Sequence, residues 1–397
     1  MQLSSAVWRR PATAVAAAGL LLTLTGVPGS PAAVAGSTDY TTKCPKPEAL
    51  VGGTTWHRHR LSTAVTLREG RRRDANGYVD MHVLYVDTTA TRLHFRPLVR
   101  KLAMRSKLTS LASGRRKLVA ATNAGYYDFR YGTPLGPVVS GGAPQLASST
   151  HQRVVGFTRT NQAQAGHLWL AGTVRGGGVT RRLAGLNVLR PTYGVTVYTP
   201  RWGSTPLSMP KDALGRYVSS GLVSSPARLY GDAPRRGFLL VARGATAQAW
   251  LRSLRVGDPV SVSKALGTDA AAPFRTALGV GAQIVKPGGI ARTDLTCRRA
   301  YPQPARTAIG FADRGRRLIV AVVADHPGDD MHGLAAGQMA RLMADLGAGE
   351  AYLLDGSGSS EMLARMPSTG KLSLRNWPAD GGPDHERTMP VGFGVFR

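Results

Sequence analysis

The chain has 397 residues, of which 43% are hydrophobic, so it can bury one large core or two ordinary ones, and disorder is not expected. Lysine and arginine total 51 against 23 acidic residues, and the net charge of +28 attracts polyanions through its long-range field. The basic residues are scattered and form no recognised nucleic-acid motif, so nucleic acid is not an expected partner, and anionic envelope polymers fit better.

The first residues have the pattern of an export signal. Arg9 and Arg10 precede a largely apolar run from Ala14 to Val27, and small residues follow up to Ala35. We predict cleavage after Ala35, with a retained anchor as the alternative, and either twin-arginine export or general secretion as the route. The run is shorter than the about 20 residues of a membrane span, and no later segment reaches that length without charges. A soluble, secreted or envelope-associated protein without a stable membrane span after processing is therefore expected.

The chain has two cysteines, Cys44 and Cys297. In an oxidising compartment an even pair more often forms a bridge than stays free. A disulfide between them, tying the N-terminus to the body, is predicted. Structural zinc is disfavoured because no CxxC or HExxH arrangement occurs.

Period-two alternation predicts a strand-rich first half. Its expected elements, in chain order, are strands over 61–67, 78–86 and 91–99, a short helix over 102–111, a strand over 117–122, and hairpins between 154 and 199. The second half is expected to hold a helix over 245–255, a strand over 260–262 and a strand over 277–289 that ends in a turn.

A strand-helix-strand unit is predicted near the C-terminus. The continuous apolar run from Leu318 to Val323 is typical of a strand covered on both faces, and it ends at Asp325. An amphipathic helix follows over 334–346, and the next strand ends at Asp355. If the two strands are parallel neighbours, both carboxylates lie at their C-terminal ends, where α/β sheets commonly bind ligands.

These elements predict an α/β (mixed α+β) fold, with a mixed sheet and flanking helices. The expected organisation is a signal peptide over 1–35, a lead-in over 36–60 and one domain over 61–397. No internal repeat or linker is evident, although a two-lobed arrangement is the alternative.

The segment Ala351 to Glu361, AYLLDGSGSSE, is the most informative stretch of the chain. An apolar strand delivers Asp355 to a rim, and Gly356 and Gly358 let the chain turn sharply and approach a ligand. The serine hydroxyls that follow can bond sugar or phosphate oxygens. An ordinary strand-to-loop turn is the alternative.

Four motifs in this order make the chain similar to the phosphodiester glycosidase family. They are NAGYY at 123–127, RTAIG at 306–310, DGSGSS at 355–360 and NWPADG at 376–381, followed by Glu386-Arg387. The resemblance covers the chain from about Leu61 onward. It departs from the family's D-G-G-G-S-S pattern at Ser357, and Glu361 follows where the family often has threonine.

The resemblance implies a glycosidase that hydrolyses an N-acetylglucosamine-1-phosphodiester-like bond in anionic glycans. Such a reaction needs an oxocarbenium-like centre to be stabilised and a water or nucleophile to be placed, commonly by carboxylates. Asp355 is the first catalytic candidate, and Asp325 and Glu386 are the others, with turn, helix-capping and ion-pairing roles as the respective alternatives. Acid and base cannot be assigned among them from the sequence.

The resemblance also supplies the substrate-binding candidates. Arg306 would hold the phosphate through paired hydrogen bonds, Asn123 would bond sugar hydroxyls, and Tyr126 or Tyr127 would stack on the ring or pack in the core. The full set of binding candidates is Asn123, Gly125, Tyr126, Arg306, Thr307, Gly356, Ser357, Gly358, Ser359, Ser360, Asn376, Asp380, Gly381 and Arg387.

No cofactor is required by this chemistry. The segment DHPGDDMH, with His326, Asp329, Asp330 and His332, leaves calcium or another divalent metal open, although its spacing is not that of an EF-hand. A serine hydrolase is the rival enzyme class, but no GxSxG elbow occurs at the serine-rich loop. A non-catalytic wall-polysaccharide-binding protein is the rival outside enzymes. The oligomeric state is not indicated by the sequence.

Overall fold

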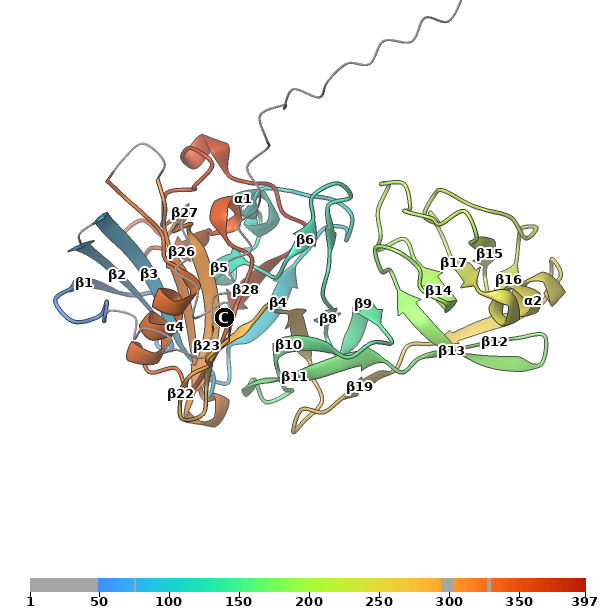
Figure 1. The fold of residues 1–397 in the computed structure, drawn as a ribbon, viewed down its shortest axis with the longest axis horizontal. Helices are drawn as coiled ribbons and strands as arrows, with labels where there is room; N and C mark the ends of the chain where they lie inside the picture. The colour runs from blue at the N-terminus through green and yellow to red at the C-terminus, as the bar shows by residue number, and fades with distance from the viewer. Residues whose placement is uncertain (1–48, 75, 294–302, 327–329) are drawn as a thin grey trace, which may run out of the picture. The chain divides into compact units, whose positions relative to one another are not determined.

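The computed structural model describes residues 49–74, 76–293, 303–326 and 330–397. By its contacts the chain divides into residues 1–43 and 44–397, and the account below concerns the second unit (Figure 1). The predicted signal segment, Cys44, Cys297 and Asp329 lie outside the described residues, so the export signal and the disulfide stay predictions.

An eight-stranded sheet, as far as it is described, carries the C-terminal motifs. In spatial order it consists of β1 (Thr55–Arg60), β2 (Val65–Asp74), β3 (Gly77–Asp87), β24 (Arg317–Val323), β23 (Arg306–Ala312), β25 (Glu350–Leu353), β21 (Gln283–Lys286) and β22 (Gly289–Ile290). Neighbouring strands in this sheet are antiparallel.

A second sheet packs against one face of the first. It consists of β27 (Leu372–Leu374), β26 (Met362–Arg365), β5 (Leu118–Asn123), β28 (Gly392–Phe396) and β4 (His94–Leu98). The other face of the eight-stranded sheet is covered by α4 (Ala336–Asp345). Consequently Leu318 and Val320 of β24 enter the core between the two sheets, whereas Ile319 and Ala321 lie in the core under the helix. The prediction of a strand covered on both faces is confirmed.

The middle of the chain forms a third, larger sheet with a core of its own. Along its main path it contains β16 (Leu222–Val223), β15 (Leu214–Ser219), β17 (Phe238–Arg243), β14 (Gly194–Tyr198), β13 (Val179–Leu186), β9 (Ala143–Ser148), β8 (Val138–Ser140), β20 (Thr276–Gly279), β10 (Gln152–Phe157), β11 (Ala163–Leu170) and β19 (Leu266–Thr268). Beside this path, β12 (Thr173–Gly176) pairs with β13 and with β18 (Val260–Ser263). Strands β6 (Tyr127–Asp128) and β7 (Thr133–Pro134) form a separate hairpin.

The remaining described helices are short. They are α1 (Leu108–Ala112), α2 (Ala245–Ser253) and the 3-10 turns η1 (Asp313–Gly315), η2 (Ser357–Ser359) and η3 (Pro383–His385). No helix in the described ranges combines the length and the apolar character that crossing a bilayer requires.

The predicted α/β fold is wrong, because the described chain is predominantly β and its large sheets are antiparallel apart from the parallel pair β13 and β14. The strand-rich first half is present, and so is the unit of β24, α4 and β25, whose helix ends as expected before Gly347 at a φ of 90°. However, β24 and β25 are not neighbours, because β23 lies between them and pairs with both in antiparallel fashion. An apolar run such as that of β24 can be buried on both faces in an antiparallel sheet, because here the second sheet covers one face of the sheet and α4 covers the other.

Candidate active site

The strand order brings three motifs to one edge. The first residue of β23, Arg306, is in register with Val323 near the end of β24, and Ala308 is in register with Leu353 at the end of β25. Asp325 and Asp355 therefore follow the same edge at which Arg306 begins. The insertion of β23 between the two parallel strands adds the RTAIG motif to this edge.

Main-chain hydrogen bonds hold the loop after β25 in place. The N–H of Asp355 donates to the carbonyl of Ala124 at 3.1 Å, and the N–H of Ser357 donates to the carbonyl of Ala305 at 2.7 Å. The loop is thereby tied both to the segment that follows β5 and to the residue that precedes β23.

Asn123 joins the two sheets at this point. Its buried amide Nδ2 donates to the main-chain carbonyl of Asp355 at 2.7 Å, and its Oδ1 accepts from the Thr307 hydroxyl at 2.8 Å and from the Glu361 N–H at 3.4 Å. Because these partners are protein atoms, the amide positions the loop. Thr307 is fully buried and serves the same contact.

Only one of the two oxygens of the Asp355 carboxyl has a hydrogen-bond partner among the described residues. Its Oδ1 accepts from the Gly356 N–H at 3.1 Å, while Oδ2 is buried without a hydrogen-bond partner among the described residues. Burial raises the pKa of Asp355, and the Ser359 hydroxyl, the Gly356 N–H and the charge of Arg387 lower it in turn. A buried oxygen without a partner is exceptional, and the neighbouring Ser359 hydroxyl, which also lacks one in the described part of the chain, is a protein group that acts on this carboxyl.

Tyr126 and Arg306 share the surroundings of Asp355. Tyr126 is 40% exposed, and burial of its hydroxyl and the charge of Asp355 raise its pKa, while Arg306 lowers it. The Arg306 Nε donates to the carbonyl of Leu334, and burial lowers the pKa of its guanidinium. Within the described ranges Arg306 makes no ion pair, so it offers a desolvated cation to an anion.

Glycines allow the neighbouring loops to approach. A Cβ at Gly125 would lie 2.1 Å from the carbonyl oxygen of Gly279, and one at Gly281 would lie 2.6 Å from the Tyr126 ring. The glycine of the NAGYY motif is thus required by a contact with β20. Tyr127, by contrast, is 5% exposed and donates its hydroxyl to the Thr388 carbonyl at 3.1 Å, so it is the core tyrosine of the pair.

Gly358 lies against an ion pair between Asp380 of the NWPADG motif and Arg387, which follows that motif. Arg387 donates from Nε and Nη2 to the two carboxylate oxygens of Asp380 at 2.7 and 2.6 Å. A Cβ at Gly358 would lie 2.0 Å from Asp380 Oδ1 and 2.4 Å from Arg387 Cζ. Hydrogen bonding to Asp380 raises the pKa of Arg387, and its guanidinium lies 5.5 Å from the centre of the Phe129 ring.

Ser357, the departure from the D-G-G-G-S-S pattern, has a φ of 55°. This left-handed conformation favours glycine, because a Cβ crowds the following carbonyl oxygen. Ser357 therefore adopts the backbone conformation that a glycine of the D-G-G-G-S-S pattern would adopt, and its Cβ makes this conformation strained.

Glu361 and Glu386 lie close together but differ in role. Glu361 is fully buried, its Oε1 accepts from the Arg387 N–H at 3.2 Å, and its Oε2 has no partner in the described part of the chain. Burial, followed by the charge of Glu386, raises the pKa of Glu361 to about 9, so it is neutral at pH 7. Glu386 accepts from the Thr109 N–H at 3.0 Å and from its hydroxyl at 2.6 Å, which ties it to the first turn of α1.

The other predicted site residues surround the same loop. Asp325 lies beside the main-chain N–H of Ala305, and burial raises its pKa. The Asn376 amide donates to the Ser360 carbonyl at 2.8 Å and accepts from the Met362 N–H at 2.8 Å. Gly381, at a φ of 118°, leads into the turn that faces His385.

The histidines considered for a metal have other contacts. His332 bonds Asp74 at 2.9 Å and the Gly333 carbonyl at 2.8 Å, and the ring of His326 packs edge-on against Trp377 at 4.8 Å. Among the residues with described positions, no group of three or more His, Cys, Asp or Glu side chains could hold a metal ion. The optional divalent ion stays a prediction.

Sequence reasoning did not identify Glu361 as a titrating group. The available signal was a carboxylate that directly follows the serine-rich loop and precedes an apolar strand. Its hydrogen-bond partners, Asn123 and Arg387, come from other segments of the chain and are not evident from the local sequence.

Comparison with known proteins gives one family. Residues 217–396 match the family model described as phosphodiester glycosidase. No curated protein matches the chain in sequence.

Three solved structures are similar to the chain. A hypothetical protein from Synechocystis is 20% identical, with a TM-score of 0.66 over 86% of this chain and 64% of its own length. A Burkholderia pseudomallei K96243 protein provisionally named as exported is 19% identical, with a TM-score of 0.63 over 81% of this chain and 74% of that one. These two likenesses show the fold alone.

The third structure is the catalytic domain of zebrafish N-acetylglucosamine-1-phosphodiester alpha-N-acetylglucosaminidase. It is 15% identical, with a TM-score of 0.46 over 87% of this chain and 88% of that one. The family match covers less of the chain than the resemblance from Leu61 onward, but it includes three of the four motifs. Over residues 217–396, the resemblance of this chain to the phosphodiester glycosidase family is confirmed.

Proposed function

We propose that the protein is an exported hydrolase that cleaves a sugar-1-phosphodiester, of the N-acetylglucosamine-1-phosphodiester kind or a related glycosidic bond, in anionic envelope or environmental glycans. The observation that carries this proposal is the Asp355 carboxyl, whose buried Oδ2 has no hydrogen-bond partner in the described structure. It lies in the electrostatic surroundings of Tyr126 and Arg387, and Tyr126 is in turn influenced by Arg306.

The reaction needs few protein groups. Water attacks the anomeric carbon, the bond from this carbon to the phosphate oxygen breaks, and the electron pair leaves with the phosphomonoester. Because the phosphate is a good leaving group, the main task is to stabilise the oxocarbenium-like centre and to place the water. Asp355 takes the proton of the water or faces the cationic carbon, and Arg306 holds the phosphate. Tyr126 offers an exposed ring for stacking on the sugar.

The serine-hydrolase alternative gains no support from the contacts. Within the described ranges, no histidine hydrogen-bonds Ser357, Ser359 or Ser360, and nucleophilic serines are activated by such a base. The other alternative, a binding protein that does not hydrolyse its ligand, is distinguished from the hydrolase by the experiment described next.

The test incubates the protein with UDP-N-acetylglucosamine and methyl-phospho-N-acetylglucosamine in ¹⁸O-labelled water and follows the products by mass. Cleavage at the anomeric carbon places ¹⁸O in the free sugar, whereas attack at phosphorus places it in the phosphomonoester. Asp355→Asn is expected to lower the rate by a factor of about 10² or more, in keeping with the loss of a general base.

Asp232→Asn is the matched control, because Asp232 is an exposed carboxylate that is not among the candidate site residues. Equal rates for the wild type and Asp355→Asn would remove Asp355 from the mechanism. Binding of the phosphodiester without any product would favour the binding protein.

A further inference from the structure

The five-stranded sheet ends in a hollow at the edge opposite the candidate active site. The hollow has a volume of about 720 Å³ and lies where β4 and β5 begin and β28 ends. We call it the basic hollow, after the basic residues that line it: Arg92, His94, Arg96, Arg115, Arg116, Lys117 and Arg397. No aspartate or glutamate side chain is among its lining residues. Its volume is within the range of ordinary ligand sites.

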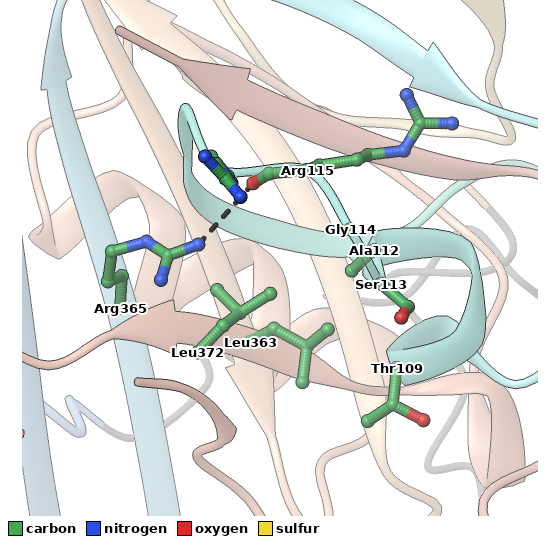
Figure 2. Close-up of a pocket in the computed structure, with 9 residues that line it drawn as sticks. Thr109, Ala112, Ser113, Gly114, Arg115, Leu363, Arg365 and Leu372 are labelled. Atoms are coloured by element: carbon green, nitrogen blue, oxygen red, sulfur yellow. Dashed lines mark hydrogen bonds between the residues drawn. The ribbon is translucent and has the colours of Figure 1, made fainter. Parts of the chain in front are cut away.

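The loop that carries Arg115, Arg116 and Lys117 is held by Arg115 itself and by Arg365 (Figure 2). Arg365 donates from Nε to the Leu118 carbonyl at 2.9 Å and from Nη2 to the Arg115 carbonyl at 3.4 Å. Arg115 donates from Nε to the Leu111 carbonyl at 2.8 Å. A second hollow of about 440 Å³, drawn in Figure 2, borders the same loop at Gly114. The loop is thus anchored from within and exposes Arg116 to solvent.

The charge in the basic hollow is not balanced by the protein. Within the described ranges, no ion pair is formed by the side chains of the exposed arginines and lysine of the hollow, which are Arg92, Arg96, Arg116, Lys117 and Arg397. Elsewhere, cations such as Arg375 and Arg387 are paired with Glu69 and Asp380. Burial, followed by the charges of Arg96 and Arg100, lowers the pKa of Arg115. This repulsion is what a bound anion would relieve.

The spread of the cations calls for a ligand with several charges. His94 and Arg96 are exposed on the same face of β4, and alternate residues of a strand lie about 7 Å apart. Arg116 and Lys117 precede β5, which lies two strands from β4, or about 10 Å away, so a ligand with several charges meets both groups better than one small anion does. The guanidinium groups match phosphate through paired hydrogen bonds.

The lining also argues against a nucleic acid. Single strands are usually held by aromatic side chains on which bases stack. The one Phe, Tyr or Trp among the residues that line the hollow is Phe396, which is 9% exposed, with the Arg96 guanidinium 6.0 Å from its ring centre. A chain of phosphates joined by polyol or sugar units needs no such platform.

We propose that the basic hollow binds an extended polymer of polyol or sugar units joined by phosphodiesters, as a second contact for the polymeric substrate. As a statement about the substrate, the inference rests on the proposed function. Strand β5 runs from Leu118 at the hollow to Asn123 at the active site, a distance of about 17 Å at 3.3 Å per residue. One polymer chain can therefore occupy the hollow while another part of it lies at Asp355.

The test measures binding of fluorescein-labelled poly(glycerol phosphate) to the full chain by fluorescence polarisation at several salt concentrations. This polymer carries no anomeric phosphate, so its binding does not depend on turnover. The triple variant Arg92→Gln, Arg116→Gln and Lys117→Gln removes three exposed cations of the hollow. The matched control, Arg175→Gln, Arg182→Gln and Lys264→Gln, removes three exposed cations of the large sheet and changes the net charge equally.

The hollow variant is expected to raise Kd by about 10-fold or more and to reduce the slope of log K against log salt by about 2, whereas the control changes Kd by less than about 2-fold. If the triple variant does not fold, Arg116→Gln and Lys117→Gln alone should each raise Kd about 2-fold. Equal losses in the two triple variants would overturn the proposal, since binding would then follow net charge only. The proposal would also be overturned, in favour of nucleic acid, if an oligodeoxyadenylate of the same charge bound more tightly than poly(glycerol phosphate) and lost as much affinity in the hollow variant.

The outcome is separable from that of the proposed function. If the protein bound the polymer specifically but hydrolysed neither phosphodiester, the proposed hydrolase function would be rejected and the proposed binding site in the hollow would stand. If the protein hydrolysed the small phosphodiesters but did not bind the polymer specifically, the hydrolase function would stand and the proposed binding site in the hollow would be rejected.

Discussion

The Asn123 amide on the five-stranded sheet donates a 2.7 Å hydrogen bond to the main-chain carbonyl of Asp355, at the end of the eight-stranded sheet. This bond, together with those that Asn123 accepts, connects the NAGYY, RTAIG and DGSGSS motifs through one side chain. The position of the proposed catalytic carboxylate therefore depends on a residue far from it in the sequence.

Replacing Asn123 should be costly for both stability and activity. Asn123→Ala leaves the Asp355 carbonyl and the Thr307 hydroxyl without their partner, and each buried polar group left in this way costs about 1–3 kcal/mol. We expect a loss of about 2–4 kcal/mol in urea unfolding, and a lower rate per folded molecule. Asn187→Ala is the control, since Asn187 is an equally buried amide in the large sheet. It should lose stability without a change in rate. Unchanged activity in Asn123→Ala would contradict the positioning role.

Ser357→Gly should stabilise the protein. Its φ of 55° is unfavourable for a residue with a Cβ, by about 1–2 kcal/mol, while the extra freedom of glycine in the unfolded chain returns about 0.4–1 kcal/mol. A net gain of about 0.5–1 kcal/mol is expected in chemical unfolding. Ser359→Gly, in the same turn but without a positive φ, should not gain stability. A loss in Ser357→Gly would show that the serine hydroxyl contributes more than the strain costs.

Glu361 should make stability depend on pH. Its folded pKa of about 9 lies above the unfolded value near 4.5, so between these values the folded state holds a proton that the unfolded state does not. Stability therefore falls as pH rises through this window, by at most about 1.4 kcal/mol per pH unit. Below pH about 4.5 both states are protonated and the effect disappears.

Glu361→Gln keeps the neutral shape and should remove this dependence. The variant is expected to match the wild type at pH 4 and to be more stable at pH 8, as measured by thermal unfolding at both values. Glu350→Gln, a partly exposed glutamate whose carboxylate accepts from the Tyr352 hydroxyl, is the control. Parallel pH curves for the wild type and Glu361→Gln would show that Glu361 is ionised in the folded protein.

The acidic limb of the pH–rate profile should report Asp355. Burial raises the pKa of this carboxyl, so activity that needs its ionised form is lost at a higher pH than for an ordinary aspartate. Because the charge of Arg387 lowers this pKa, Arg387→Gln should move the limb of kcat/KM to higher pH. Asp380→Asn, which removes the negative partner and keeps the Arg387 cation, should not move it upward. A limb that is unaffected by Arg387→Gln would assign it to another group.

Local patterns predicted many elements correctly. The apolar run at Leu318–Val323, the amphipathic stretch before Gly347 and the strand into Asp355 appear as β24, α4 and β25, because periodicity and the glycine stop are local properties. The fold class was wrong because these three elements suggested a parallel βαβ unit. Nothing in them shows that the preceding strand, β23, inserts between β24 and β25.

The predicted site residues do surround one loop, but their contacts could not be assigned from the sequence. Asn123 and Asn376 are engaged with main-chain atoms, Glu386 with the first turn of α1, and Arg387 with Asp380. Each of these partners is fixed by the packing of the sheets. Roles that depend on free polar atoms therefore appear only when burial and competing partners are known.

By itself the sequence determined the four motifs, the glycine and aspartate that follow β25, and the excess of positive charge, because these are properties of residue type and order. Only the tertiary structure decided that Glu361 is buried and neutral, that Asp355 has a buried oxygen without a hydrogen-bond partner among the described residues, and that the basic residues of the hollow gather without an aspartate or glutamate side chain. The physical reason is that desolvation and charge pairing depend on the distances between side chains from remote segments, and antiparallel sheet packing sets those distances.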